Sequence, residues 1–304
     1  EDSSTLVNLI EGFEIAGKFF KRKNLHNDLN NIKKIIENLD VSHVDNFFSL
    51  FYGYDFVALD LTKWDTSNVI SLDSTFKYCK VPINISTWNV SNVKRMEETF
   101  AYCEVSMDVS NWDTSNVENL VSTFNGCKVP FDVSRWNTSK VKHMDKTFAG
   151  SEVTMDVSNW DVSNVISMSH MFQGSEFNGD ISKWDVSNVD DMSSMFKYSL
   201  FNGDISQWNV SKVTNMAFMF KGSMFNGDIS NWDVSNVISM EEMFKDSKFN
   251  GDISKWNVQN VFYADNIFIG SPLENVYPNG INDLKRKKES LLRKFLYQSI
   301  WQDI

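Results

Sequence analysis

Apolar and polar positions recur along this chain with a period of 24 residues. Each copy has a tryptophan, a valine five residues later and a phenylalanine twelve residues later. The tryptophans are Trp64, Trp88, Trp112, Trp136, Trp160, Trp184, Trp208, Trp232 and Trp256. A degenerate earlier copy begins at Leu39, so the copies extend from residue 39 to residue 270. A fixed period of this length predicts a repeat solenoid of about ten 24-residue turns, in which each turn buries its apolar side against its neighbours.

Two segments of each copy carry different apolar patterns. The segment GDIS places Ile181 and its equivalents between polar residues, which predicts a short strand that forms one rung of a parallel sheet. The segment SNVISMEEMF places Val237, Met240, Met243 and Phe244 at a spacing typical of one helix face, so it predicts a short helix. Glycine two residues after the phenylalanine in several copies predicts a left-handed helix end, and copies with Tyr or Asp there are expected to close differently.

Helical patterns outside the repeats predict caps at both ends. Residues 5–20, 27–38 and 282–302 have apolar residues at helical spacing, and the last segment contains the basic run KRKK. We therefore divide the chain into an N-terminal helical cap at 1–38, the repeats at 39–270 and a C-terminal helical cap at 271–304. The alternative is that the terminal helices mediate self-association or anchoring.

Residue size is compensated between two positions of each turn. Thr75 and its equivalents in four copies are followed eight residues later by a large side chain such as Ile83. In the next four copies the first position is methionine, as at Met195, and the second is glycine, as at Gly203. Because close-packed interiors resist changes in volume, we interpret the two positions as touching within one turn.

The tryptophans have two possible roles. Ile181 and Trp184 are three residues apart, so they cannot share a face of one continuous strand, and the chain must turn near Trp184 if both point inward. A corner tryptophan would stack on its neighbours and bond its indole N–H to a nearby acceptor. The alternative is an exposed tryptophan stripe that binds carbohydrate.

Composition and charge narrow the class of protein. With 304 residues, 42% hydrophobic and 14% aromatic, the chain has ample apolar content for a packed core. A formal net charge of -11 argues against a nucleic-acid surface. The sequence shows no apolar run long enough to span a membrane and no signal peptide. Cys79, Cys103 and Cys127 share one repeat position, which favours buried, reduced thiols.

The sequence predicts no catalytic or cofactor-binding residue and no cofactor, hence a protein that is not an enzyme. The four histidines, His26, His43, His143 and His170, occupy unrelated repeat positions. Nucleophile motifs and glycine-rich phosphate loops are missing from the sequence.

Two rows of acidic or amide residues flank the tryptophans. The aspartate row, four residues before each tryptophan, comprises Asp108, Asp132, Asp156, Asp180, Asp204, Asp228 and Asp252. We predict that each carboxylate accepts backbone N–H bonds in its own turn. The weaker alternative is calcium held between Asp156, Asp180, Asp204 and Asp228. The residue after each tryptophan is Asp or Asn, which predicts a cap for the following helix.

The positions that packing does not occupy are candidates for partner contact. The pre-tryptophan row, the residue before each tryptophan, comprises Lys63, Thr87, Asn111, Arg135, Asn159, Lys183, Gln207, Asn231 and Lys255. The two residues after each repeat valine complete this candidate contact face. A solenoid presents such side chains at a fixed spacing, so the candidate function is protein binding.

The repeat W-[DN]-[VT]-S-N-V-x-x-M-x-x-[MT]-F-x-x-[CS] with the linker FNGDIS resembles the BspA-like family of mycoplasma-lipoprotein-type surface repeats. The resemblance covers residues 39–270 and implies a leucine-rich-repeat-like solenoid that serves adhesion or other protein binding at the cell surface or after secretion. The alternative function is a structural, self-assembling component of a cell envelope or virus particle. No lipoprotein cysteine or wall anchor is visible, so a cytoplasmic or virion location stays open.

Overall fold

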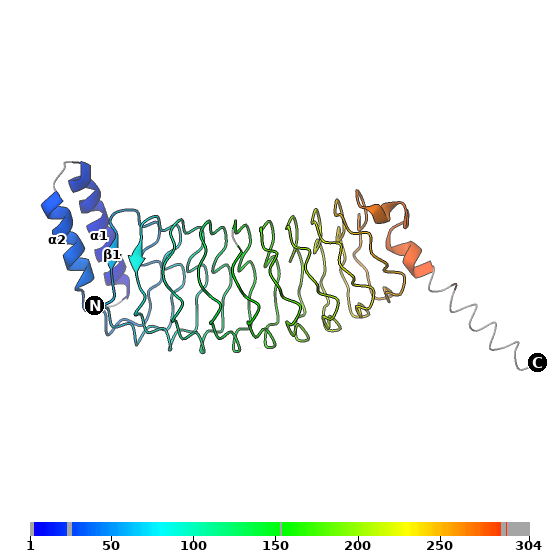
Figure 1. Ribbon diagram of the computed structural model, residues 1–304, viewed down its shortest axis with the longest axis horizontal. Coiled ribbons are helices and arrows are strands. Elements are labelled where there is room, and N and C mark those ends of the chain that lie inside the picture. Colours follow the sequence, from blue (N-terminus) through cyan, green and yellow to red (C-terminus); the bar gives the residue numbers. More distant parts are fainter. Residues whose placement is uncertain (1–2, 23–25, 153, 287–289, 291–304) are drawn as a thin grey trace, which may run out of the picture.

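The computed structural model describes residues 3–22, 26–152, 154–286 and 290. The repeats stack side by side into an elongated body, with helices α1 (Ser3–Arg22) and α2 (His26–Glu37) against its N-terminal end (Figure 1). The 3-10 helix η1 (Pro272–Glu274) and a helical segment from residue 281 follow the last turn. Much of the predicted C-terminal helix, including part of KRKK, lies outside the described residues.

A backbone ladder joins each turn to the next. Parallel bridges link one residue per turn, seven positions after the tryptophan, from Asn46↔Ser71 through to Ser239↔Tyr263. Within the ladder, alternate N–H groups donate across to the following turn, as Leu72 does to Arg95 O at 2.9 Å. The intervening N–H groups donate three residues back within their own turn, as Thr75 does to Leu72 O at 3.1 Å. The ladder therefore satisfies its backbone groups without regular secondary structure.

The predicted repeat helices are wrong. In the described part of residues 39–270 there is no α-helix, and the segment equivalent to SNVISMEEMF forms the ladder instead. The residue ten positions after the tryptophan has a left-handed φ in every copy, from Ser49 (57°) to Asn266 (57°), and a right-handed helix cannot contain it. Successive three-residue turns bring an apolar side chain inward about every third residue, which mimics one face of a helix.

The left-handed position after the phenylalanine does not depend on glycine. Tyr78, Tyr102, Tyr198 and Asp246 have φ between 55° and 60°, close to the 62–66° of Gly126, Gly150, Gly174 and Gly222. The expectation that these copies close differently is wrong, because the same hydrogen bond to the next turn holds every copy that has a following turn. Tyr78 N–H, for example, donates to Ala101 O at 2.9 Å.

The strand prediction holds only at the start of the stack. Strands β1 (Leu59–Asp60) and β2 (Ile83–Asn84) pair in parallel just before the first two tryptophans. The later GDIS segments form no strand among the described residues. The continuous ladder follows each tryptophan in the sequence, whereas GDIS precedes it. The prediction of sheet-like stacking is therefore wrong about the segment that forms it.

Each tryptophan is a buried corner residue. All nine are only 2–4% exposed, and the indole N–H of each donates to a backbone carbonyl of the preceding element at 3.0–3.4 Å. From Trp64 to Trp160 the neighbouring rings stack with centroids 6.1–6.5 Å apart. The corner interpretation is confirmed, and the exposed carbohydrate-binding stripe is wrong because the rings have no free face.

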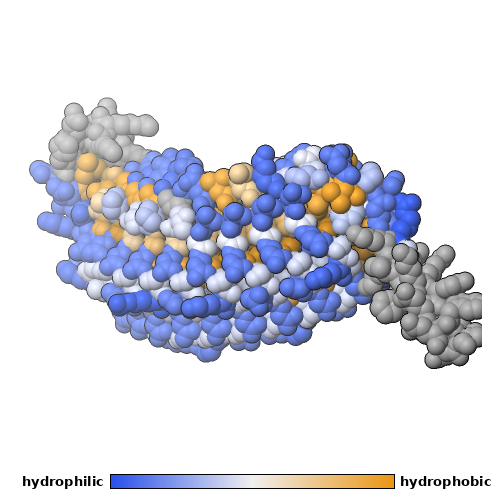
Figure 2. Space-filling view, turned by 45° about the vertical axis from the view of Figure 1, so that its right-hand side comes forward, coloured by the Kyte–Doolittle hydropathy of each residue, from blue (hydrophilic) through white to orange (hydrophobic). Residues whose placement is uncertain are grey.

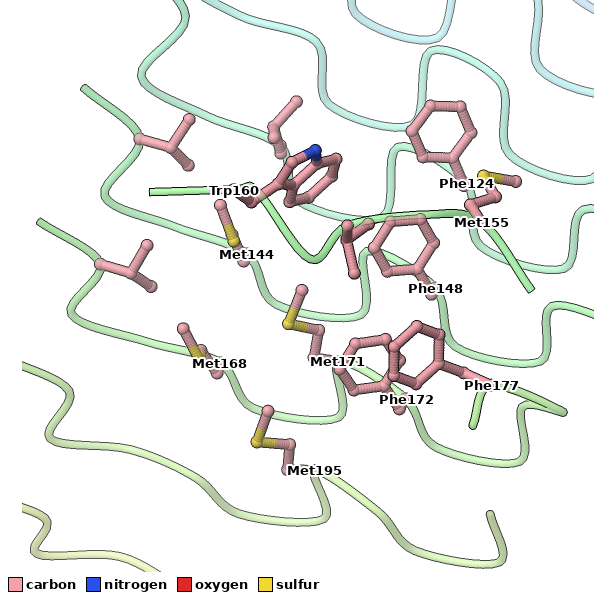
Figure 3. Close-up of a cluster of buried hydrophobic side chains, with 14 of the residues drawn as sticks. Phe124, Met144, Phe148, Met155, Trp160, Met168, Met171, Phe172, Phe177 and Met195 are labelled. Carbon is pink, nitrogen blue, oxygen red and sulfur yellow. The ribbon is translucent and has the colours of Figure 1, made fainter. Parts of the chain in front are cut away.

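A second column of rings runs beside the tryptophans. The repeat phenylalanines stack on one another from Phe51 to Phe268 with centroids 5.5–6.1 Å apart. In the later copies a further ring packs against this column, as Phe177 does on Phe172 at 4.2 Å (Figure 3). The core is thus a set of parallel columns that continue from turn to turn.

The compensating glycine makes room for a different side chain from the one that the sequence suggested. A Cβ on Gly203 would lie 2.8–2.9 Å from the ring of Phe201, so Phe201 and not Met195 occupies that space. In earlier copies Phe131, which stands at the glycine position, packs on the same column at 5.3 Å from Phe124. One large side chain per turn covers the column, and it comes from either of two positions.

The helices α1 and α2 complete the core at the N-terminal end. Leu6, Ile10, Ile32 and Ile36 are buried in the same apolar cluster as the repeats. At the other end, Leu273, Tyr277, Ile281 and Leu284 join that cluster. Both ends of the stack therefore bury apolar side chains against segments outside the repeats.

Replacing Trp208 with phenylalanine keeps a ring but removes the indole donor to the Ile181 carbonyl, which then accepts only the backbone N–H of Trp184. We expect Trp208→Phe to lower the free energy of unfolding by about 1–3 kcal/mol, and Trp208→Ala by about 3–5 kcal/mol because it also opens a cavity. Urea denaturation followed by circular dichroism measures both. An unchanged midpoint for Trp208→Ala would contradict the corner role.

Gly203→Met should collide with Phe201 and destabilise the fold by about 1–3 kcal/mol. Adding Phe201→Val makes these two positions valine and methionine, as at Val105 and Met107, and should recover much of the loss in the same denaturation assay. The matched control combines Gly203→Met with Met195→Thr, for which we expect no recovery. Additive effects of the first pair, or recovery by the second, would refute the assignment.

Candidate functional site

The pre-tryptophan row is exposed in all nine copies. Each member follows the buried inward residues of its turn and precedes a buried tryptophan, so the corner directs its side chain outward. Hydrophilic side chains form parallel rows along the length of the stack (Figure 2). Because equivalent positions of successive turns stack, the row runs along the stack through Lys63, Arg135, Asn159, Lys183, Gln207, Asn231 and Lys255. That these residues contact a partner stays a prediction.

The aspartate row beside it forms turns. In Asp108, Asp132 and Asp156 one carboxylate oxygen accepts both the N–H and the hydroxyl of the serine two residues on, at 2.7–3.2 Å. Ser206 and Ser230 donate their N–H groups to Asp204 and Asp228 in the same way, each at 2.9 Å. The predicted turn role of the row is confirmed.

The hydrogen bonds in this row outweigh the repulsion between neighbouring carboxylates. The backbone N–H of the serine, followed by its hydroxyl, lowers the pKa of Asp180, Asp204 and Asp228. The adjacent aspartates act on Asp204 in the opposite direction but do not reverse the shift. The turns of these three aspartates thus favour the ionised carboxylate.

The alternative role of the aspartate row, calcium binding, has no support from a cluster of metal-ligating side chains in the described residues. Among the residues that the structure describes, no group of three or more His, Cys, Asp or Glu side chains is arranged to hold a metal ion. Asp156, Asp180, Asp204 and Asp228 each stand in a different turn with an oxygen already bonded to serine. The row is accounted for by its turns.

The Asp or Asn after each tryptophan also forms a turn, and no helix follows it. Its side-chain oxygen accepts the N–H two residues on, as Asp65 accepts Ser67 N–H at 3.0 Å and Asn89 accepts Ser91 N–H at 3.0 Å. The predicted helix cap is therefore wrong, although the oxygen does accept a backbone N–H. The turn lets the chain leave the tryptophan corner.

Sequence reasoning missed a row of asparagine side chains that fasten one turn to the previous one. Asn92 and Asn164, four residues after their tryptophans, donate Nδ2–H to Ser67 O and Ser139 O, both at 2.7 Å. Where lysine replaces this asparagine, Lys140 bonds Asn116 Oδ1 at 2.6 Å instead. The recurrent S-N pair in each copy was the available signal for this row.

Aromatic and basic side chains gather on the outer side of the ladder, where the sequence was not searched for a site. The rings of Tyr78 and Tyr102 stack at 4.9 Å. Further along, Lys197 Nζ lies 5.2 Å from the ring centre of Phe218 and 5.5 Å from that of Tyr198. Each of these contacts joins two or three neighbouring side chains on a small part of the surface.

The cysteine column, formed by Cys79, Cys103 and Cys127, is buried, and its thiols are not reactive. Cys79, Cys103 and Cys127 are free thiols with no exposed surface. Burial raises the pKa of Cys79 to about 12 and that of Cys103 to about 11, so both remain protonated at neutral pH. The predicted reduced, buried thiols are confirmed.

The geometry defines a repeat protein whose outer surface consists of ordered polar rows. The chain belongs to the family described as Mycoplasma protein of unknown function, DUF285, which matches residues 19–130, 102–200, 122–223 and 175–277. No curated protein and no solved structure matches the chain. None of the helices in the described residues has the length and apolar character that crossing a membrane requires.

The aspartate turns predict acid sensitivity. Because the folded-state pKa of Asp180, Asp204 and Asp228 is lowered, their stabilisation is present above the unfolded pKa of about 3.9 and is lost as pH falls through the folded value. Replacing all three by asparagine keeps the acceptor, as Asn84 shows by accepting Ser86 Oγ–H at 2.9 Å. We expect this variant to melt like the parent at neutral pH and to lose less stability on acidification.

Thermal melting from about pH 5 to about pH 2.5 measures this difference. The control replaces the same three aspartates by alanine, which should lower the melting temperature already at neutral pH. Identical pH profiles for the asparagine variant and the parent would contradict the role of these carboxylates.

Proposed function

We propose that the chain is a non-enzymatic solenoid that binds a protein partner through the pre-tryptophan row. Its stacked turns, outward polar rows and buried aromatic columns support a leucine-rich-repeat-like scaffold of the BspA-like kind. Such a scaffold holds many side chains at a fixed spacing of about 4.8 Å, which suits an extended partner surface. Adhesion at a cell surface, or after secretion, is the setting that the resemblance favours.

The observation that carries this proposal is the contrast between neighbouring positions of the repeat. The residues four and two positions before each tryptophan bond to each other in turns, and the tryptophan itself is buried. The pre-tryptophan row is exposed in every copy, and its residue type changes from copy to copy among Lys, Arg, Asn, Gln and Thr. Positions that do not maintain the fold are free to specify a partner.

The row offers hydrogen-bond donors and positive charge on an acidic protein. Lys63, Arg135, Lys183 and Lys255 contribute four cations to a chain whose formal net charge is -11. The flanking aspartates are occupied by their serines and give the row a fixed, polar border. A partner with acidic and amide groups would match this surface.

Removing the four cations should weaken binding without unfolding the protein. We expect Lys63→Ser, Arg135→Ser, Lys183→Ser and Lys255→Ser together to raise the Kd for the partner by about tenfold or more, since Thr87 and Asn111 show that small polar residues fit the row. Binding to a panel of purified extracellular-matrix and cell-surface proteins, measured by biolayer interferometry, identifies the partner first.

The matched control replaces four exposed lysines outside the candidate contact face, Lys80, Lys128, Lys146 and Lys248, by serine. It changes the net charge equally and should leave the Kd within about threefold of the parent. Equal losses in both variants, or no binding to any member of the panel, would overturn the proposal. Light scattering of the parent would show large assemblies if the structural alternative were correct.

A further inference from the structure

The last turn of the stack has backbone N–H groups whose equivalents in every earlier turn donate to the following turn. In the turn before it, four N–H groups donate across to the last turn at 2.7–3.0 Å. They are those of Met240, Glu242, Phe244 and Asp246, and their acceptors are Tyr263 O, Asp265 O, Ile267 O and Ile269 O. The equivalent N–H groups of the last turn belong to Ala264, Asn266, Phe268 and Gly270. Only that of Gly270 has an acceptor within the described residues, Glu274 Oε2 at 2.9 Å.

Unpaired donors along an ordered backbone form an open edge. A row of such groups is a template on which another extended segment can pair. The N-terminal end of the stack has α1 and α2 against it (Figure 1). At the C-terminal end Leu273, Tyr277 and Leu284 pack on the core, but no described residue bonds the N–H groups of Ala264, Asn266 and Phe268. The two ends are therefore closed to different degrees.

A groove follows this open edge. Its volume is about 370 Å³. It is lined by residues 261–262 and 264–269 of the last turn, and by Glu274, residues 277–282 and Lys285 of the segment that follows. That volume is at the lower end of the range for ligand-sized cavities. The three unpaired donors thus stand beside space that a short stretch of extended chain can enter.

Large apolar side chains are exposed at the same place. Phe262 is 80% exposed and Tyr263 is 65% exposed, the highest values for any residue in the described repeats that is large and hydrophobic. In internal turns the residue equivalent to Tyr263 accepts the bridge from the turn before and also begins the ladder toward the turn after. Apolar groups and backbone donors together match the two components of strand addition.

The charges around the groove select the kind of segment. Asp265 and Glu274 line it, and the chain as a whole is acidic. The one lining lysine, Lys285, donates from Nζ to Val261 O at 2.8 Å and closes the side of the groove. A segment with basic side chains is therefore favoured over an acidic one.

We propose that the C-terminal edge, formed by Ala264, Asn266 and Phe268, binds an extended basic segment of a partner protein, which adds to the ladder as one more parallel rung. The segment supplies backbone carbonyls at alternate residues to the three N–H groups. This site lies at the end of the stack and does not depend on the pre-tryptophan row.

The chain itself provides probes with the required backbone register. Residues 141–151, VKHMDKTFAGS, present the carbonyls of His143, Asp145 and Thr147 to the preceding turn. A synthetic peptide of this basic sequence should bind the full-length protein, and residue-resolved amide exchange by NMR should slow at Ala264, Asn266 and Phe268. The amides of Met240, Glu242 and Phe244 serve as internal controls, because they are already bonded.

Two comparisons test the charge selection. The peptide of residues 237–247, VISMEEMFKDS, has the same register but is acidic, and should bind about tenfold more weakly. Asp265→Ser should weaken the basic peptide several-fold, since serine occupies this repeat position at Ser169 and Ser193. Asp190→Ser, on an exposed residue away from the edge, should leave its binding unchanged.

Three results would overturn the proposal. Binding without slower exchange at the three amides would place the peptide elsewhere. Slow exchange in the protein alone, independent of dilution, would mean that the chain covers its own edge. Slow exchange that is lost on dilution would identify a second copy as the occupant.

Discussion

The alternation of hydrogen bonds along the ladder is the constraint on which the rest of the structure depends. One N–H closes a three-residue turn within its own repeat, and the next reaches across to the following repeat. The alternation requires a left-handed residue in each copy, which costs about 1–2 kcal/mol when that residue is not glycine. Ser, Glu, Lys, His, Phe and Asn all adopt it, because hydrogen bonds to the neighbouring turn hold the backbone on both sides.

Once the ladder sets the register, equivalent side chains of successive turns must lie against one another. The phenylalanine and tryptophan columns, the buried thiols and the outer polar rows all follow from this single relation. Volume therefore has to be balanced within a column as well as within a turn. Phe201 beside Gly203 and Phe131 beside Phe124 are two solutions to the same requirement for one large group on the phenylalanine column.

The register between successive turns also divides the surface positions into two kinds. Some have side chains that hold the fold together, and others do not. Aspartate, serine and asparagine rows look suited to binding, yet their side chains bond to backbone groups of their own or the preceding turn. The pre-tryptophan row is different, because its cations are exposed and only Thr87 is seen to bond the preceding turn among the described residues, donating its hydroxyl to Thr62 O at 2.8 Å. The C-terminal edge is different because no later turn follows it. A repeat protein of this kind can thus contact partners along its side and at its end by separate physical means.

The sequence by itself determined the period, the buried corner tryptophans, the serine-bonded aspartates and the exposed pre-tryptophan row. These features depend on side-chain size, polarity and local turn chemistry, which can be read from a single turn and its copies. Only the tertiary structure decided that SNVISMEEMF forms the ladder and that Gly203 accommodates Phe201. It also decided that the N–H groups of Ala264, Asn266 and Phe268 have no acceptor among the described residues. Apolar residues about three positions apart fit both a helix and a run of tight turns. The choice between them is made by hydrogen bonds to a neighbouring turn 24 residues away, which no local pattern contains.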